Sequence, residues 1–272
     1  MRFAVTVKNR NAPMQSQVCR FCHVRQRNIC RAMTEPRELA ALEAARSGTI
    51  VVRPHEMIYR QGAPVGDVYN ILSGWVALYQ TLADGRRQIV ALLLAGDVFG
   101  IEPDGLSVMT CSAEALTSAS LCLIPRERAA DLRVRFPAYG ETFLSFVERE
   151  YALAIEHITS IGRRTALERI AHLLIEIVSR VKRHYPLADG ESAQLPLTQT
   201  EIGDMLGLTG VHVNRMLRQL REEGLVDVQP GSVRIIDAER LAKVANAAEG
   251  AFAFAPESPE PGGEQTPHRA RG

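Results

Sequence analysis

The sequence predicts an α+β protein in which a β-roll, a long helix and a winged helix-turn-helix domain follow one another. Three observations predict this order. Short β-branched and aromatic runs separated by glycines fill 48–125, a helical pattern of apolar residues covers 139–180, and two short capped helices precede a strand pair in 198–236. The chain has 272 residues, 46% hydrophobic and 23% charged, which is ample core material for two domains.

The first 31 residues carry seven Lys and Arg residues and no acidic residue, although the whole chain has a net charge of only +1. The balanced total excludes a uniformly basic coat protein. An Arg-rich start also occurs in organellar transit peptides, but this one holds three cysteines and lacks the apolar core of a signal peptide. We therefore expect a cysteine-bearing arm over residues 1–33.

Three further features of composition bear on location and order. The longest apolar run, 89–95, has seven residues, whereas a membrane-spanning helix needs about 20, so no membrane partner is expected. Five cysteines is an odd count, which fits a reduced, cytoplasmic setting better than a disulfide framework. Residues 247–272 contain four prolines and four glycines and are expected to form a disordered tail.

Residues 34–137 are expected to form the β-roll. A short helix at 34–47 opens this segment, because Thr34 can cap it and Pro36 suits its first turn. Ala83-Asp84-Gly85 marks a hairpin turn, and many short strands at close spacing favour an antiparallel barrel or roll. The expected strands are 50–52, 57–59, 68–72, 75–79, 88–94 and 120–124.

A helix over 138–165 is expected to pair with a second copy of itself and so to form a homodimer. Its apolar residues recur every three or four positions in a long stripe between two domains. The alternative is that the stripe packs only on the roll of its own chain. Gly162 is expected to interrupt or kink the helical pattern. The residues expected in the dimer contact are Tyr151, Ala154, Ile155, Ile158 and Ile161.

Residues 166–240 are expected to form a winged helix-turn-helix domain. Thr198 and Glu201 fit a capping box at the start of one helix. Gly207 suits the turn that follows, and Thr209 can cap a second helix. A strand–turn–strand pattern comes next and predicts the wing.

The second of these helices is expected to read double-stranded DNA in the major groove. Arg215 can donate two hydrogen bonds to guanine, and Asn214 can pair with adenine. Because 198–236 has a net charge of −1, its cations must act through their arrangement. The alternative is a structural helix pair with solvated charges. The residues of this helix expected to contact DNA are Val211, His212, Asn214, Arg215 and Arg218. Among the cations, those expected near phosphates are Arg163, Arg164, Arg218 and Arg221.

Cys19, Cys22 and Cys30 form a C-x2-C-x7-C pattern, and Cys122 lies on an expected strand. Four thiolates can bind a [4Fe–4S] cluster, which would tie the arm to the roll. Two alternatives remain open. One is a zinc site that uses the three arm cysteines with His23 or Cys122, and the other is a switch based on thiol oxidation. The fifth cysteine, Cys111, is expected to be structural or merely reactive.

At this point the sequence resembles the cyclic-AMP receptor protein superfamily of bacterial transcription regulators. Three motifs carry the resemblance: Gly74-Trp75-Val76, Gly96-Asp97-Val98-Phe99-Gly100 and 206–215. The resemblance implies a cyclic-nucleotide-binding-like roll (a double-stranded β-helix), a dimerisation helix and a winged helix-turn-helix. It also implies homodimers on palindromic operators, with RNA polymerase as a partner.

No cyclic nucleotide is expected, however. The superfamily's nucleotide-binding members carry an Arg-Ser-Ala-type element, where this chain has Cys111-Ser112-Ala113, and Asp97 stands in place of their Glu. A buried cyclic phosphate without its cation would be costly.

The cysteines resemble those of the FNR-like branch, which carries three N-terminal cysteines and a fourth in a Cys-x-Ile-Pro-like stretch, here 122–125. The resemblance implies that Cys19, Cys22, Cys30 and Cys122 hold an oxygen-labile [4Fe–4S] cluster that supports the active dimer. Oxygen would convert the cluster to a smaller one and then to apoprotein, so genes would respond to anaerobic or microaerobic conditions.

Two departures from the branch affect these expectations. Its DNA-reading motif Glu-x-x-Ser-Arg is matched by Val211, Asn214 and Arg215, so only the arginine is retained and the half-site is expected to change. Ala154 stands where the family has an acidic residue on the dimerisation helix.

The chain is not expected to be an enzyme, since it lacks paired carboxylates, a nucleophile elbow, a phosphate loop and an HExxH motif. The alternatives are a same-fold regulator that senses redox or metal through thiols alone, an Fe–S electron-transfer protein and, as the weakest, a domain that binds a small-molecule effector.

Overall fold

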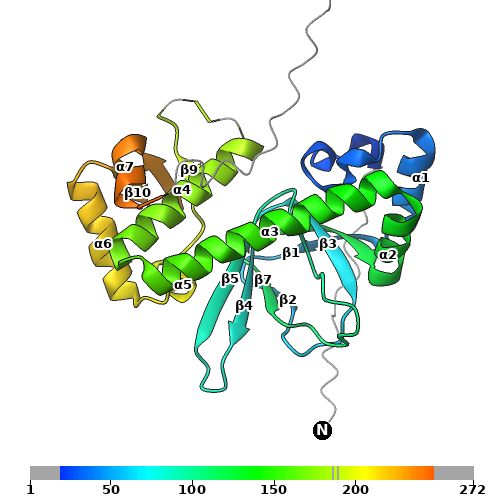
Figure 1. The fold of residues 1–272 in the computed structure, drawn as a ribbon, viewed down its shortest axis with the longest axis horizontal. Coiled ribbons are helices and arrows are strands. Elements are labelled where there is room, and N and C mark those ends of the chain that lie inside the picture. Colours follow the sequence, from blue (N-terminus) through cyan, green and yellow to red (C-terminus); the bar gives the residue numbers. More distant parts are fainter. Residues whose placement is uncertain (1–18, 186, 189, 248–272) are drawn as a thin grey trace, which may run out of the picture.

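The structure is a computed structural model that describes residues 19–185, 187–188 and 190–247 (Figure 1). Residues 1–18 of the expected arm and 248–272 of the expected tail lie outside the described residues. The described residues form an α+β fold, as predicted, with a β-roll below a long helix and a helix-turn-helix domain beyond that helix. No helix among them is long and apolar enough to span a membrane.

The elements follow in a simple order along the chain. Three short 3-10 turns precede the first helix: η1 (Cys19–Phe21), η2 (Arg25–Arg27) and η3 (Ile29–Ala32). The helices are α1 (Pro36–Ala45), α2 (Arg126–Arg135), α3 (Pro137–Arg163), α4 (Ala166–His184), α5 (Gln199–Leu206), α6 (Gly210–Glu222) and α7 (Ala238–Val244). The roll strands are β1 (Gly48–Val52), β2 (Met57–Tyr59), β3 (Asp67–Ser73), β4 (Val76–Thr81), β5 (Arg87–Leu93), β6 (Val98–Phe99), β7 (Ser112–Ala115) and β8 (Ala119–Pro125). The wing strands are β9 (Ala193–Gln194), β10 (Val226–Gln229) and β11 (Ser232–Ile235).

The roll consists of two four-stranded antiparallel sheets, ordered β1-β8-β3-β6 and β2-β7-β4-β5. Apolar side chains from both sheets, including Ile71, Leu93 and Leu121, fill the space between them. The sequence did not predict β6, which has two residues, or β7, whose Ser-Ala-Glu-Ala lacks the β-branched and aromatic residues that signal a strand.

Gly74 connects β3 to β4 at a point where the chain passes very close to the start of β8. Its φ is +89°, and a Cβ there would collide with the carbonyl oxygen of Ser118. Only glycine satisfies both conditions. Its neighbour Trp75 is buried and donates its indole N–H to Gln194 Oε1 at 2.9 Å, which links the roll to the wing.

Two helix boundaries differ from the expectation. Glu35, not Thr34, is the N-cap of α1, and the Glu38 carboxylate accepts hydrogen bonds from both of these backbone N–H groups. Gly162 lies inside α3, which ends at Arg163. Thr165 then caps α4 in a capping box with Glu168. The first backbone N–H groups of a helix have no partner within that helix. The capping box satisfies them, and it therefore allows α4 to begin as a separate helix at this point.

The helix-turn-helix domain packs against the roll of its own chain. Arg87 on β5 pairs with Asp204 on α5 at 2.9 Å, and Gln88 donates to the carbonyl oxygen of Met205 at 2.9 Å. Apolar residues of the roll and of the domain form one continuous cluster, including Leu92 and Leu206. The two parts therefore share a core.

A buried network of charges joins the roll, α3 and α4. Asp97 follows β5 in the chain and accepts a 2.7 Å hydrogen bond from Arg180 on α4. Arg180 also pairs with Glu176 at 3.4 Å, and Glu176 lies 2.8 Å from Nε2 of His157 on α3. Arg149 on α3 completes the network at 3.4 Å from Asp97. Separating these elements would leave buried charges unpaired, which costs several kcal/mol per ion, or about 3–5 kcal/mol for a broken pair.

The network shifts the pKa values of His157 and Glu176 in opposite directions. Burial by itself would lower the pKa of His157, but the Glu176 carboxylate raises it above the ordinary value. Burial by itself would raise the pKa of Glu176, but His157 and Arg180 lower it to about 2. The stabilisation from His157 is therefore complete below the ordinary histidine pKa and is lost as the pH rises through the raised value.

We predict that His157→Gln lowers the melting temperature by several degrees at pH 6 and by much less at pH 9, because only the protonated imidazole pairs with Glu176. Calorimetry of both proteins at the two pH values measures this difference. His55→Gln, a substitution at an exposed histidine, serves as the control and should change little at either pH. An equal loss at both pH values would show that His157 acts only through packing.

Candidate functional site

The arm (residues 19–33 here) reaches the roll as a series of tight turns. The Asn28 side chain accepts a hydrogen bond from the Cys30 backbone N–H at 2.8 Å and so begins η3. The Arg25 guanidinium donates to the carbonyl oxygen of Met33 at 2.9 Å, which closes the turn series on itself. These local bonds orient the cysteines of a segment that has no strand and no α-helix of its own.

Apolar and polar contacts hold the arm in place. Ile29 and Met33 are fully buried in a cluster that includes residues of α1, β3, β8 and α3. Val24 packs with Leu72 and Cys122 in a second cluster. His23, considered above as a zinc ligand, uses its Nε2 in a 2.9 Å hydrogen bond with the carbonyl oxygen of Leu72. It tethers the arm to β3.

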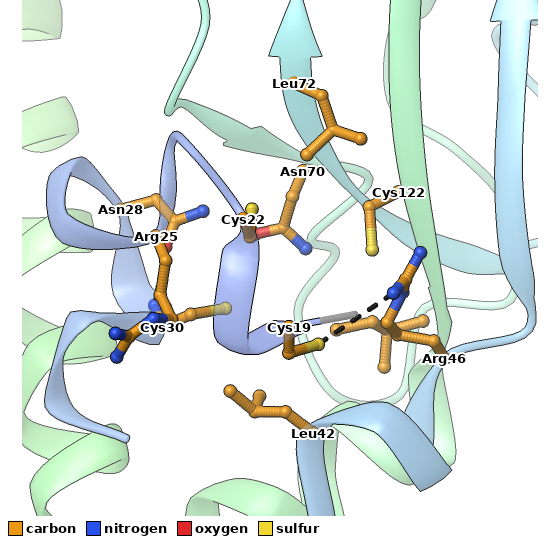
Figure 2. A pocket seen from close by; sticks show the side chains of 11 residues that line it. Cys19, Cys22, Arg25, Asn28, Cys30, Leu42, Arg46, Asn70, Leu72 and Cys122 are labelled. Carbon is orange, nitrogen blue, oxygen red and sulfur yellow. Dashed lines mark hydrogen bonds between the residues drawn. The ribbon is translucent and has the colours of Figure 1, made fainter. Parts of the chain in front are cut away.

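Four cysteines surround one cavity between the arm and the roll (Figure 2). Cys19, Cys22 and Cys30 come from the arm, and Cys122 comes from β8. The cavity has a volume of about 30 Å³, and its apolar wall is formed by Leu42, Leu72 and Ile124. Cys122 is at least 92 positions away from each arm cysteine in the sequence, yet all four thiols line the same cavity.

The register of the β3–β8 ladder explains why Cys122 faces the arm. Cys122 lies directly opposite Asn70 on β3, so both side chains project from the same face of the sheet. Their neighbours on that face, Val68 and Ile124, also pack against the arm. Ile71 and Leu121 point the other way, into the roll interior.

Asn70 is a residue of this cavity that the sequence analysis did not identify. Neither its amide nitrogen nor its amide oxygen has a hydrogen-bond partner among the described residues, although the side chain is only 2% exposed. Such a group costs about 1–3 kcal/mol. A signal was present in the sequence, since β3 alternates Val68, Asn70 and Leu72 on its outer face and places one polar residue in an apolar series.

Burial controls the chemistry of the thiols. It raises the pKa of Cys122 to about 11 and the pKa of Cys30 well above its ordinary value. It also raises the pKa of Cys19, and the Arg46 guanidinium, which donates to Cys19 Sγ at 3.9 Å, partly offsets this effect. Burial thus disfavours the thiolate form of these three cysteines, a cost that neighbouring positive charge or a bound metal centre has to offset.

The donor set fits an iron–sulfur cluster. Four soft thiols line an otherwise largely apolar space, and Arg25 and Arg46 supply positive charge beside it. A [4Fe–4S] cluster binds one thiolate per iron, so its ligands stand around a volume instead of meeting at one point. Within residues 19–185, 187–188 and 190–247, no group of three or more His, Cys, Asp or Glu side chains is arranged to hold a single metal ion.

Cys111 lies elsewhere. It directly precedes β7, and its thiol accepts a 3.9 Å hydrogen bond from the Thr110 hydroxyl. It does not line the four-cysteine cavity.

The Asp97 carboxylate already has partners within the chain. It accepts hydrogen bonds from Leu94 N–H and from Arg180, in addition to its contact with Arg149. Its carboxylate is therefore already an internal counter-ion.

A second candidate site is the outer face of α6. Thr209 caps this helix, and Gly207 at φ +67° ends α5, both as predicted. Val213, Leu217 and Leu220 are buried against the domain core. The side chains of Val211, Asn214, Arg215 and Arg218 are exposed, and His212 is half-buried.

Several polar partners on this face were not predicted. Asn214 donates to Gln199 Oε1 at 3.1 Å, and Arg218 pairs with Glu222 at 2.7 Å. Arg164, expected near phosphates, pairs instead with Glu156 at 3.1 Å and is largely buried.

The sequence analysis also did not identify the role of Gly203. A Cβ at this position would collide with the carbonyl oxygen of Leu208, so glycine permits the tight turn between α5 and α6.

The third candidate surface is the exposed stripe of α3, which we call the α3 stripe. It contains the five residues predicted for the dimer contact together with Leu144 and Val147. Ile158 is the most exposed of its large residues, at 71%. The opposite face of α3 buries Tyr139, Phe146 and Ser160.

Comparisons with known proteins agree with this architecture. Residues 168–244 match the Crp-like helix-turn-helix domain, and residues 49–135 match the cyclic nucleotide-binding domain. The chain is 31% identical over 214 residues to the transcriptional activator protein FnrL of Cereibacter sphaeroides, covering 78% of this chain and 84% of FnrL. It is 30% identical over 194 residues to the transcriptional activatory protein AadR of Rhodopseudomonas palustris, covering 71% and 80% respectively. The solved structure of FixK2 from Bradyrhizobium japonicum matches with a TM-score of 0.67 and 32% identity, over 74% of this chain and 98% of FixK2.

Proposed function

The chain belongs to the CRP/FNR family of transcription regulators, and within this family we propose that it is an FNR-type regulator controlled by an oxygen-labile [4Fe–4S] cluster. It is a DNA-binding protein and not an enzyme. The proposed ligands are Cys19, Cys22, Cys30 and Cys122. In this role the protein works in the cytoplasm, where genes respond to anaerobic or microaerobic conditions.

One observation carries the proposal: Cys122 on β8 shares its cavity with the three cysteines of the arm. A cysteine whose only role was to pack as a small apolar residue of β8 would not need three other cysteines beside it. When bound, the cluster would supply an inorganic centre that dioxygen can oxidise. The residues present hold the arm against the roll, and Arg25 and Arg46 offset the negative charge of four thiolates.

The arm also contacts α3, the proposed dimerisation helix, so the four-cysteine cavity and the proposed dimer contact share this helix. Ile29 and Met33 pack in the same cluster as Tyr139 and Phe146 of α3. The α3 stripe begins on the other side of this same part of the helix, at Leu144. We propose that release of the arm loosens this half of α3 and so weakens the dimer.

The spacing of the α3 stripe supports a homodimer. Leu144, Val147, Tyr151, Ala154, Ile158 and Ile161 alternate in steps of three and four, which is the a/d pattern of a two-helix coiled coil. A dimer related by a two-fold axis would place two α6 helices on a palindromic operator. A bound dimer would then act on transcription through RNA polymerase, the remaining proposed partner.

The alternatives are less well supported. A bare thiol switch needs accessible thiols, whereas Cys122 is buried and Cys19, Cys22 and Cys30 are only partly exposed. An electron-transfer protein would have no use for a capped helix pair with a wing. Membership in a family of transcription regulators argues against this second alternative.

We predict that the protein purified without oxygen contains about 4 Fe and 4 sulfide per chain, because each iron takes one thiolate. Cys122→Ser should remove most of this iron, as measured by iron and sulfide analysis with the visible absorbance spectrum. Cys111→Ser is the matched control and should keep the full content. Full iron in Cys122→Ser would remove Cys122 from the ligand set.

For DNA reading, Arg215→Ala should weaken binding to the operator by about 1–3 kcal/mol and relax the preference at one base position, because Arg donates in pairs to guanine. Binding to a selected operator and to random DNA, measured by fluorescence anisotropy, separates base contact from phosphate contact. Arg218→Ala is the comparison variant and should weaken both DNAs alike. An equal loss on random DNA for Arg215→Ala would reassign that residue to phosphate binding.

For the dimer, we expect Ile158→Glu to give monomers in sedimentation velocity under anaerobic conditions, because two carboxylates would face each other in an apolar contact. Val134→Glu is the control, since Val134 is 82% exposed but lies on α2, away from the α3 stripe. Persistence of the dimer in Ile158→Glu would exclude this helix face from the interface.

A further inference from the structure

The buried amide of Asn70 is not explained by the fold. Its nitrogen and oxygen have no hydrogen-bond partner among the described residues, and the side chain lines the four-cysteine cavity. In Figure 2 the amide extends from β3 between Cys22 and Cys122. A polar group that reaches an apolar space without a partner indicates that something else occupies that space when the protein works.

The strand register excludes an accidental orientation. Asn70 lies directly opposite Cys122 across the β3–β8 ladder, so their Cβ atoms are close and their side chains share one face. Val68 and Leu72, the next residues on this face, are apolar and buried. An apolar residue at position 70 would fit this surface better than an amide, since it would bring no polar group to satisfy.

We propose that Asn70 positions and protects the iron–sulfur cluster by donating an Nδ2–H hydrogen bond to sulfur, either a cysteine thiolate beside it or a bridging sulfide. The inference rests on the proposed function, because it requires a cluster in this cavity. Asn70 is a positioning residue and not a ligand to iron. Its effect would be on how long the cluster survives oxygen.

The physical reason is electrostatic. Hydrogen bonds to the sulfurs of a cluster stabilise its more negative charge state and raise its reduction potential. Dioxygen attack withdraws an electron from the cluster to oxygen, so a donor at this position makes the first loss of charge less favourable. Arg46 acts near Cys19, at 3.9 Å from its Sγ, whereas Asn70 acts between Cys22 and Cys122.

The test is Asn70→Leu, which has nearly the same shape and no donor, in the full-length protein purified anaerobically with its cluster. The first measurement is the decay of visible absorbance in air-saturated buffer, which we expect to be about three- to tenfold faster than in the wild type. The second is the melting temperature of the apoprotein, which we expect to rise because an unsatisfied buried amide is removed. If Asn70 had a purely structural role, its replacement would not shorten the cluster lifetime in air while it raised the melting temperature of the apoprotein.

Two further variants complete the design. Asn70→Gln keeps an amide donor and should retain a cluster lifetime closer to the wild type than Asn70→Leu does. Leu72→Val alters the same wall without removing a donor, so it should lower the apoprotein melting temperature and change the cluster lifetime by less than about twofold.

The outcomes are distinct. An unchanged lifetime in Asn70→Leu, or a lower apoprotein melting temperature, would overturn the role of Asn70 while leaving the cluster in place. A wild-type protein without iron and sulfide would overturn the proposed function, and this inference with it. A folded Asn70→Leu that retains no cluster after anaerobic reconstitution would also overturn the positioning role, because that role requires a cluster that assembles and is then lost faster in air.

Discussion

The antiparallel pairing of β3 with β8 is the constraint on which the rest of the structure depends. One face of this ladder, with Ile71 and Leu121, closes the interior of the roll. The other face, with Cys122 and Asn70, receives the arm. Because side chains alternate along a strand, a shift of one residue would exchange the two faces and place Cys122 inside the roll. The filled interior therefore fixes the register, and the register determines where the fourth thiol lies.

Local signals made most of the fold predictable. The caps at Thr198 and Thr209 and the turn at Gly207 depend on neighbours within a few residues, and the structure has them as expected. The start of α4 at Thr165 had an equally local signal, a capping box with Glu168, which the apolar periodicity across it concealed. What the sequence could not supply was the partnership of distant side chains. Asp97 with Arg180, and Asn70 with the cysteines, are separated by tens of residues and meet only once the roll and the helices have packed.

The helix α3 contacts both the arm and the buried charge network. At one end this helix packs against Ile29 and Met33 of the arm, and towards the other it carries His157 of the buried charge network. The network also includes Arg180 of α4, so α3 is linked to the helix-turn-helix domain through paired charges as well as through packing. Densely packed elements respond to changes as units, not by gradual deformation.

The pairing of Asp97 with Arg180 has a consequence for engineering. The carboxylate belongs to the roll and the guanidinium to α4, so the two regions form one structural unit although their sequences match separate domains. A chimera that joined this roll to a foreign helix α4 would take from the buried Asp97 the nearer of its two arginine partners and leave it only the 3.4 Å contact with Arg149. Exchange of DNA specificity between relatives should therefore use a junction after residue 190, so that α4 stays with the roll that it neutralises and α5, α6, the wing and α7 are replaced together.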